Sequence, residues 1–186
     1  MRKKHVRNLT AGCAAFMAAA FVFSAGFSKT AFADEADKTT LVYGSTDYTR
    51  INPAMDEHCE INVLLFDGLT DHDGDNQIIP RLAKSWEYDE ENLTYTFHLE
   101  EGVKWHDGEP FTAEDVKFTF EAIMDPANES ENAPDYEDIE SIEVIDEHTV
   151  TFHLSNVNTA FLEYMTKPVM PKHLLEGEDW QTSDFF

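Results

Sequence analysis

Four consecutive residues gather side chains that could bind a ligand. Glu57 and Glu60 supply carboxylates, His58 an imidazole and Cys59 a thiol, just before an expected helix. All of these groups serve as metal ligands in proteins, but the side chains of adjacent residues rarely converge on one ion. The preferred interpretation is therefore a polar helix start, and a metal site is the alternative.

A second cluster resembles the start of a calcium-binding loop. Asp71, Asp73 and Asp75 stand at alternate positions, as the first ligands of such a loop do. The loop pattern then requires glycine at position 76 and glutamate at position 82, where this chain has Asn76 and Leu82. The segment is therefore predicted to be a solvated hairpin turn.

The other histidines show no arrangement that is typical of catalysis or of zinc binding. No two histidines have H-x-x-x-H spacing, and the chain has no C-x-x-C pair. A serine nucleophile elbow, a P-loop and a dinucleotide-binding glycine pattern are also absent from the sequence. His106, Asp107 and Gly108 are more typical of a turn than of half a catalytic pair. The sequence predicts a protein that is not an enzyme and that uses no metal and no cofactor.

The first 33 residues differ in kind from the rest of the chain. An apolar or small-residue stretch covers 9–27, and Ala31 and Ala33 stand where a signal peptidase reads small residues. The basic start consists of Arg2, Lys3, Lys4 and Arg7. Together these features predict a secretory signal peptide over 1–33, with a transmembrane anchor as the alternative.

Cys13 follows Thr10, Ala11 and Gly12 in a pattern that resembles a lipoprotein acylation site. An acylated cysteine normally comes after the apolar stretch, whereas here most of the apolar residues come after Cys13. The preferred interpretation is a small apolar residue inside the signal peptide. A lipid anchor on Cys13 is the alternative.

The charge balance excludes some partners. Removing residues 1–33 takes away five of the 13 basic residues and none of the 37 acidic ones, which leaves a formal charge of −29. Such a surface repels nucleic acid and anionic lipid headgroups. Cys59 is then the only thiol, so no internal disulfide forms and the core alone must hold the fold together. The remaining length, about 150 residues, suits one modest domain.

The hydrophobic pattern predicts a mixture of strands and helices. Tyr95, Phe97 and Leu99 alternate with polar residues, which indicates a half-buried strand. Thr112 is a helix N-cap followed by acidic residues, and Asp125 with Pro126 ends that helix. The expected strands cover 40–44, 94–99 and 150–154, the expected helices 60–66, 112–124 and 159–165, and a surface loop 125–140. Without regular βαβ alternation, the fold class predicted from this pattern is α+β.

Three stretches of the chain lie close together: AKSWE at 83–87, TYTFHL at 94–99 and GVKWHDGEPFTAEDV at 102–116. In order, spacing and residue types they resemble the signature region of the family-5 bacterial solute-binding proteins, which include oligopeptide-, dipeptide- and nickel-binding proteins. Further similar segments are INP at 51–53, LFDGL at 65–69 and DEHTVTFHL at 146–154. One departure is Glu100, where the family usually has a basic residue.

The resemblance implies a periplasmic-binding-protein-like type II fold, in which two lobes close over a ligand. It implies that 34–66 begins the first lobe, that 67–168 forms a small α+β domain, and that 169–186 returns toward the first lobe. Trp86, Trp105 and the strand at 94–99 are expected to supply the core of the small domain. Because family members are longer, the chain is expected to be truncated, with an incomplete first lobe. By itself it is expected to bind solute weakly or not at all.

By the same resemblance, the protein is expected to be the substrate-binding component of an ABC importer. It would capture peptides outside the membrane and deliver them to permease subunits, in the periplasm or at the cell surface. Capture of nickel or a metal chelate is the alternative within the family. A secreted surface fragment without a transport role is the third hypothesis.

The resemblance also places the ligand contacts. The loop after Asn52 and Pro53 lies at the cleft in peptide binders, and Glu57, His58 and Cys59 match its contact positions. Main-chain groups there would pair with an extended peptide, and Glu57 could meet a cationic group. Tyr48 and Tyr136 are weaker candidates, proposed because aromatic faces suit adaptable ligands.

Overall fold

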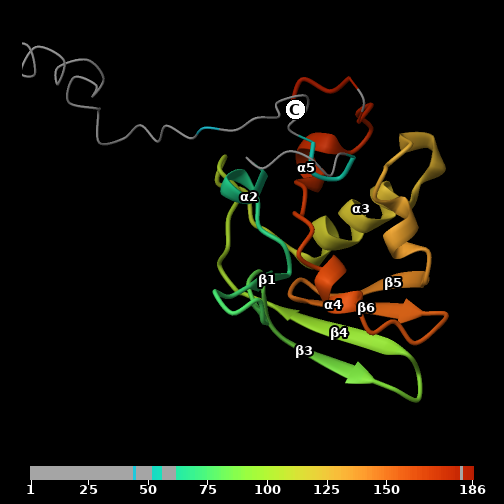
Figure 1. Cartoon of the computed structure of the whole chain (residues 1–186). Helices are drawn as coiled ribbons and strands as arrows, with labels where there is room; N and C mark the ends of the chain where they lie inside the picture. Colours follow the sequence, from blue (N-terminus) through green and yellow to red (C-terminus); the bar gives the residue numbers. More distant parts are fainter. Residues whose placement is uncertain (1–43, 45–51, 56–61, 181) are drawn as a thin grey trace, which may run out of the picture. The chain divides into compact units, whose positions relative to one another are not determined.

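The computed structural model describes residues 44, 52–55, 62–180 and 182–186 (Figure 1). The predicted signal peptide and nearly all of the predicted strand at 40–44 lie outside the described residues. The elements below all belong to the compact unit that starts at Ser45. Within the part of the chain that the structure describes, no helix is long and apolar enough to cross a membrane.

A four-stranded antiparallel sheet forms the centre of this unit. Its strands are β3 (Ala83–Asp89), β4 (Thr94–Leu99), β5 (Ile139–Asp146) and β6 (Thr149–Leu154). Their order in the sheet is β3-β4-β6-β5, so the two predicted strands lie in the middle. The sheet, together with the helices that cover one face of it, confirms the predicted α+β class (Figure 1).

The alternation read from the sequence is present in the central strands. Tyr95, Phe97 and Leu99 of β4 are buried, whereas the residues between them are partly exposed. On the outer face, the hydroxyl groups of Thr96 and Thr151 lie 3.0 Å apart across the pair β4–β6. Cross-strand threonine pairs of this kind stabilise a sheet.

Helix α3 (Ala113–Met124) begins as predicted. The hydroxyl of Thr112 accepts a hydrogen bond from the backbone N–H of Glu114 at 3.3 Å, and the Asp115 carboxylate accepts one from the N–H of Thr112 at 2.9 Å. This reciprocal capping box satisfies donors that a helix start would otherwise leave free. The apolar stripe of α3, which includes Phe120, faces the sheet (Figure 1).

Aromatic rings hold helix and sheet together. The Phe152 ring lies edge-on at a centroid distance of 5.3 Å from Phe120 and 5.6 Å from Phe97. Phe161 of α4 (Phe161–Tyr164) joins the same cluster, 5.6 Å from Phe152. Trp86 and Trp105, which were expected to supply the core, are only partly buried at its margin.

The aspartate-rich segment is a hairpin turn, as predicted. It connects β1 (Thr70–His72) and β2 (Ile78–Pro80), which pair in antiparallel fashion. The Asp73 carboxylate accepts hydrogen bonds from the backbone N–H groups of Asp75 and Gln77, both at 2.9 Å. The Asp73 carboxylate therefore stabilises the turn that the sequence predicts.

The connection at 125–140 differs from the surface loop that was expected. It contains two short 3-10 helices, η1 (Pro126–Asn128) and η2 (Ala133–Tyr136). Its acidic residues are largely exposed, but Ser130, Asn132 and Tyr136 are buried. The prediction of a solvated loop is therefore wrong for these three side chains, because they pack inward against other segments.

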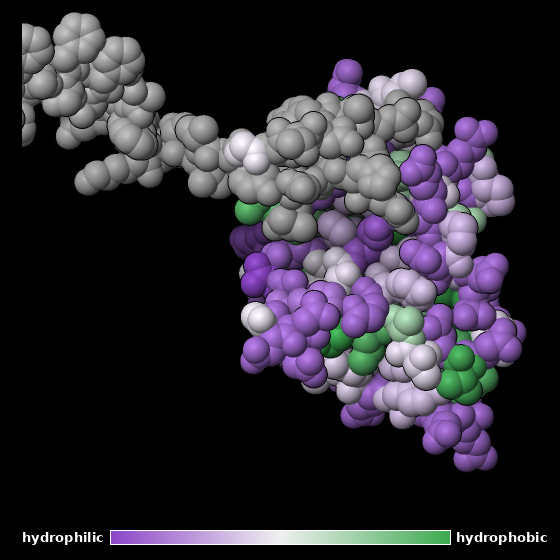
Figure 2. All heavy atoms as spheres, in the orientation of Figure 1, coloured by the Kyte–Doolittle hydropathy of each residue, from purple (hydrophilic) through white to green (hydrophobic). Residues whose placement is uncertain are grey.

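Two short helices complete the described fold, α2 (Asn62–Leu65) and α5 (Lys172–Leu175). The α2 segment confirms part of the helix predicted at 60–66. The face drawn in Figure 2 is mostly hydrophilic, with hydrophobic residues scattered over it. This surface agrees with the acidic composition of the chain.

Candidate functional site

Most of the predicted ligand contacts lie outside the described residues. These are Tyr48, Glu57, His58 and Cys59. The structure does describe the segments on either side of the predicted contact loop, Asn52 to Met55 before it and α2 after it. These two described segments therefore mark the ends of the predicted contact loop.

The segment from Asn52 to Met55 is a buried turn held by its first side chain. The Met55 N–H donates to the Asn52 carbonyl at 3.2 Å. The Asn52 side chain donates from Nδ2 to the Trp180 carbonyl at 2.9 Å and accepts from the Ala54 N–H at Oδ1, at 3.2 Å. Asn52 is only 1% exposed, and both ends of its amide are satisfied.

The same turn is tied to the connection that follows α3. Ser130 Oγ and Asn132 Nδ2 both donate to the Ala54 carbonyl, at 2.6 and 3.1 Å. Asn132 Oδ1 in turn accepts a hydrogen bond from Lys167 Nζ at 2.7 Å. Segments far apart in the sequence thus meet at Ala54, three residues before the predicted contact Glu57.

Tyr136 is the one predicted contact within the described residues. Its side chain is buried, its hydroxyl donates to the Tyr164 carbonyl at 2.8 Å, and its ring lies edge-on to Phe120 at 5.2 Å. Burial raises the pKa of the Tyr136 hydroxyl above its ordinary value. The structure places Tyr136 in the core, and its role in ligand binding stays a prediction.

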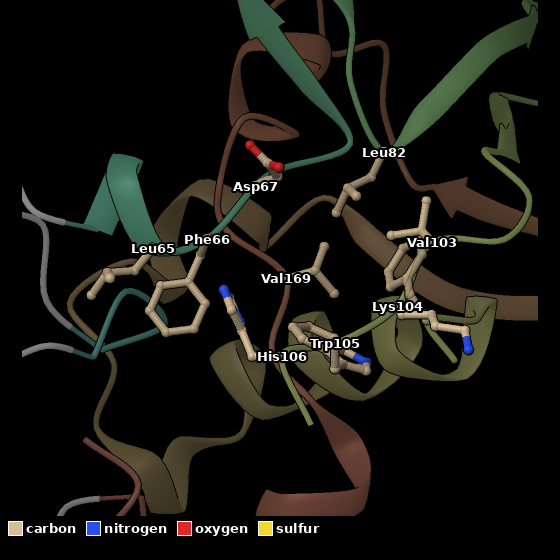
Figure 3. Close-up of a pocket in the computed structure, with 10 residues that line it drawn as sticks. Leu65, Phe66, Asp67, Leu82, Val103, Lys104, Trp105, His106 and Val169 are labelled. Carbon is tan, nitrogen blue, oxygen red and sulfur yellow. The ribbon is translucent and has the colours of Figure 1, made fainter. Parts of the chain in front are cut away.

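A small cavity of about 90 Å³ lies between α2 and the signature segment (Figure 3). Apolar side chains dominate its lining, including Phe66, Trp105 and Val169. Figure 3 shows the carboxylate of Asp67 pointing away from the cavity, and Arg81 Nε binds that carboxylate at 2.8 Å. Ligand pockets usually measure several hundred Å³, so this cavity suits at most one small apolar group.

Asp115 joins the signature segment to α5. Asp115 is 4% exposed, and its carboxylate accepts hydrogen bonds from the backbone N–H of Lys172 at 2.9 Å and from Trp105 Nε1 at 3.4 Å. Next to it, His173 Nε2 lies 2.7 Å from a carboxylate oxygen of Asp107. The hydrogen bond from His173, followed by one from the backbone of Glu109, holds the pKa of Asp107 below its ordinary range.

Two further histidines each pair with one carboxylate, His72 with Glu163 at 2.6 Å and His153 with Glu143 at 3.5 Å. Within 52–55, 62–180 and 182–186, no three or more histidine, cysteine, aspartate and glutamate side chains come together so as to hold a metal ion.

The anchoring residues had no local signal in the sequence. Asn52 and its partner Trp180 are 128 residues apart, and Ser130 and Asn132 are 76 and 78 residues from Ala54. A buried asparagine or serine resembles any loop residue until its partner is known. Only the resemblance of the INP segment pointed toward this region.

The described fold is an antiparallel sheet with helices on one face, and the stretches 83–87, 94–99 and 102–116 contribute to β3, β4 and the start of α3. Residues 77–185 match the sequence pattern of the bacterial extracellular solute-binding proteins of family 5, in their middle part. The chain belongs to this family.

Curated relatives of the chain include proteins named for peptide binding. The chain is 43% identical over 99 residues to a Brucella ovis protein whose name describes it as an ABC transporter peptide-binding protein. It is 37% identical over 122 residues to di/tripeptide-binding protein 1 of Pseudomonas aeruginosa. These matches cover 53% and 56% of this chain but only 19% and 23% of the relatives.

Solved structures share the fold. NikZ from Campylobacter jejuni, in complex with Ni(L-His), is 41% identical with a TM-score of 0.73, over 75% of this chain and 29% of that protein. Haemophilus influenzae OppA, in complex with the peptide RPPGFSPFR, is 27% identical with a TM-score of 0.62, over 68% of this chain and 29% of that protein. These similarities confirm that the described part of the chain has a periplasmic-binding-protein type II fold.

Proposed function

We propose that the protein is the substrate-binding component of an ABC importer and that it captures peptides outside the membrane and delivers them to permease subunits. The observation that carries the proposal is the match of residues 77–185 to the solute-binding family. The names of the Brucella and Pseudomonas relatives support peptides as the solute. Because the chain spans about a fifth of the length of these relatives, the solute and the permease partner are both part of the proposal.

The ligand site in this proposal lies at the loop after Asn52 and Pro53. Glu57, His58 and Cys59 would offer main-chain groups to an extended peptide, with Tyr48 nearby in the sequence. The buried turn from Asn52 to Met55 supports the assignment, because a binding loop needs a firmly held backbone at its base. Binding without catalysis agrees with the absence of catalytic motifs in the sequence.

Export and domain organisation belong to the same proposal. The basic and apolar leader over 1–33 would direct the protein out of the cytoplasm and be removed. Residues 34–66 and 169–186 would then belong to the first lobe, and 67–168 to the small domain. A periplasmic or cell-surface location follows for the working protein.

Capture of nickel or a metal chelate is the second candidate. The structure of NikZ with Ni(L-His) supports it, at 41% identity to this chain. His58 and Cys59 supply donor groups that nickel accepts. This candidate differs from the first in its solute, and it predicts the same kind of permease partner.

Measuring which solute the host cell takes up distinguishes peptide capture from nickel capture. We would delete the gene that encodes this chain and measure the uptake of radiolabelled di- and tripeptides, and of radiolabelled nickel supplied with L-histidine. Uptake of a free amino acid serves as the control. The proposal expects peptide uptake to fall and to recover when the gene is restored.

The other outcomes are equally informative. Loss of nickel uptake with unchanged peptide uptake would favour the second candidate. Unchanged uptake of both solutes would contradict a transport role and favour a secreted surface protein.

A further inference from the structure

Two polar side chains in the connection after α3 are buried, although a connection of this kind usually faces water. Asn132 is 0% exposed and Ser130 is 9% exposed. Burying a hydroxyl or an amide is unfavourable unless the group finds a hydrogen-bond partner. Both side chains find the same partner, the carbonyl oxygen of Ala54.

The contact fixes two consecutive peptide units of the turn. The Ala54 carbonyl has two lone pairs and accepts from both Ser130 Oγ, at 2.6 Å, and Asn132 Nδ2, at 3.1 Å. The next carbonyl, that of Met55, accepts from the backbone N–H of Glu131 at 3.4 Å. Ala54 and Met55 are themselves buried, at 0% and 3% exposure, so these bonds are shielded from water.

Asn132 is held from its other side as well. Its Oδ1 accepts from Lys167 Nζ at 2.7 Å, and a charged donor makes a stronger hydrogen bond than a neutral one. This bond fixes which way the amide group points, so that Nδ2 is directed at the Ala54 carbonyl. Ser130 Oγ also accepts from the N–H of Asn132 at 3.2 Å, which joins the two side chains into one unit.

We infer that Ser130 and Asn132 are positioning residues of the ligand site: they hold the backbone of Ala54 and Met55, and through it they set the affinity for the captured solute. The inference rests on the proposed function, because the predicted contacts Glu57, His58 and Cys59 directly follow this turn in the sequence. Ser130 and Asn132 thus act on ligand affinity through the buried backbone of Ala54 and Met55 and need not touch the ligand themselves.

The test compares two variants that each lack one hydroxyl group, made in the full-length protein that the gene encodes. Ser130→Ala removes one donor to Ala54. Thr119→Val is the matched control, since the Thr119 hydroxyl is also buried and bonds to backbone groups of Asp115 and Met170. Asn132→Ser, which removes the second donor, keeps the inference testable if Ser130→Ala fails to fold.

Two readouts are measured on each variant well below its melting temperature. Hydrogen exchange of residues 52–55 reports on the clamp and needs no ligand. Calorimetric titration with di- and tripeptides, and separately with Ni²⁺ and L-histidine, reports on affinity. We expect Ser130→Ala to speed exchange and weaken binding of the captured probe by about 10-fold each, the scale of one buried hydrogen bond. Thr119→Val should change neither readout.

The outcomes separate this inference from the proposed function. Unchanged exchange at 52–55 in Ser130→Ala would overturn the clamp, whatever the ligand. Faster exchange with unchanged affinity would overturn the positioning role while the proposed function stands, and so would an equal loss of affinity in Thr119→Val. Failure of the unaltered protein to bind any of the probes would overturn the proposed function, and the positioning role with it.

Discussion

At the residue scale, Gly68 lies where the chain has no room for a side chain. A Cβ atom there would come within 2.5 Å of the Thr166 carbonyl oxygen and 2.8 Å of that of Met165. Both contacts are with backbone, which cannot turn aside as a flexible side chain does. The family-like segment LFDGL therefore needs its glycine for close packing of two chain segments.

Gly68→Ala should lower the free energy of unfolding by about 1–3 kcal/mol, the usual effect of overpacking. Gly74→Ala is the matched control, since a Cβ at Gly74 meets nothing within 4 Å. Urea denaturation of both variants is the measurement. Equal stability of the two variants would contradict the packing argument.

The pair of Asp107 and His173 gives a prediction about pH. The folded-state pKa of Asp107 is depressed, chiefly by the hydrogen bond from His173. A depressed pKa means that the folded state prefers the ionised carboxylate. This contribution to stability is therefore present above the ordinary aspartate pKa, and it is lost as the pH falls through the lower, folded value.

His173→Ala should move the titration midpoint of Asp107 upward toward the ordinary value, and NMR titration of the carboxyl carbon measures it. The return should be partial, because the backbone N–H of Glu109 still donates to Asp107. His72→Ala, which removes a histidine paired with Glu163, should leave the midpoint in place. An Asp107 midpoint that His173→Ala does not move would show that the hydrogen bond is absent in solution.

At the element scale, α3 depends on both halves of its capping box. Thr112→Ala should destabilise the protein by about 1 kcal/mol, while Thr112→Ser, which keeps the hydroxyl, should change little. Asp115→Ala should cost more, about 2–4 kcal/mol, because the buried carboxylate also accepts bonds from Lys172 and Trp105. Thermal unfolding gives the order of the three variants, and an Asp115→Ala variant as stable as Thr112→Ala would refute the linking role of Asp115.

The same scale shows what the sequence could predict. Strands β4 and β6 and helix α3 could be predicted because each buries a complete apolar face, with a clear period. The edge strands β3 and β5 were not predicted, because each has one fully buried residue, Ala83 and Ile142, among charged neighbours. An edge strand packs few side chains into the core and often carries charged ones, so its sequence shows little apolar alternation.

At the scale of the whole molecule, the fold class followed from pattern, and the type II fold followed from resemblance to known proteins. The residues that hold the turn at 52–55 followed from neither. The hydrogen bonds of Asn52, Ser130 and Asn132 form only when segments distant in the sequence meet. The residue types and their positions in loops therefore did not predict these bonds. The predicted contacts at Glu57, His58 and Cys59 stay predictions.

Peptide capture is the central claim, and direct titration tests it. The protein purified from its own host would be titrated calorimetrically with a mixture of di- and tripeptides, and separately with Ni²⁺ and L-histidine. We expect saturable binding of peptides and no comparable binding of the nickel complex. Saturable binding of Ni²⁺ with L-histidine alone, or no binding of any peptide, would contradict the claim.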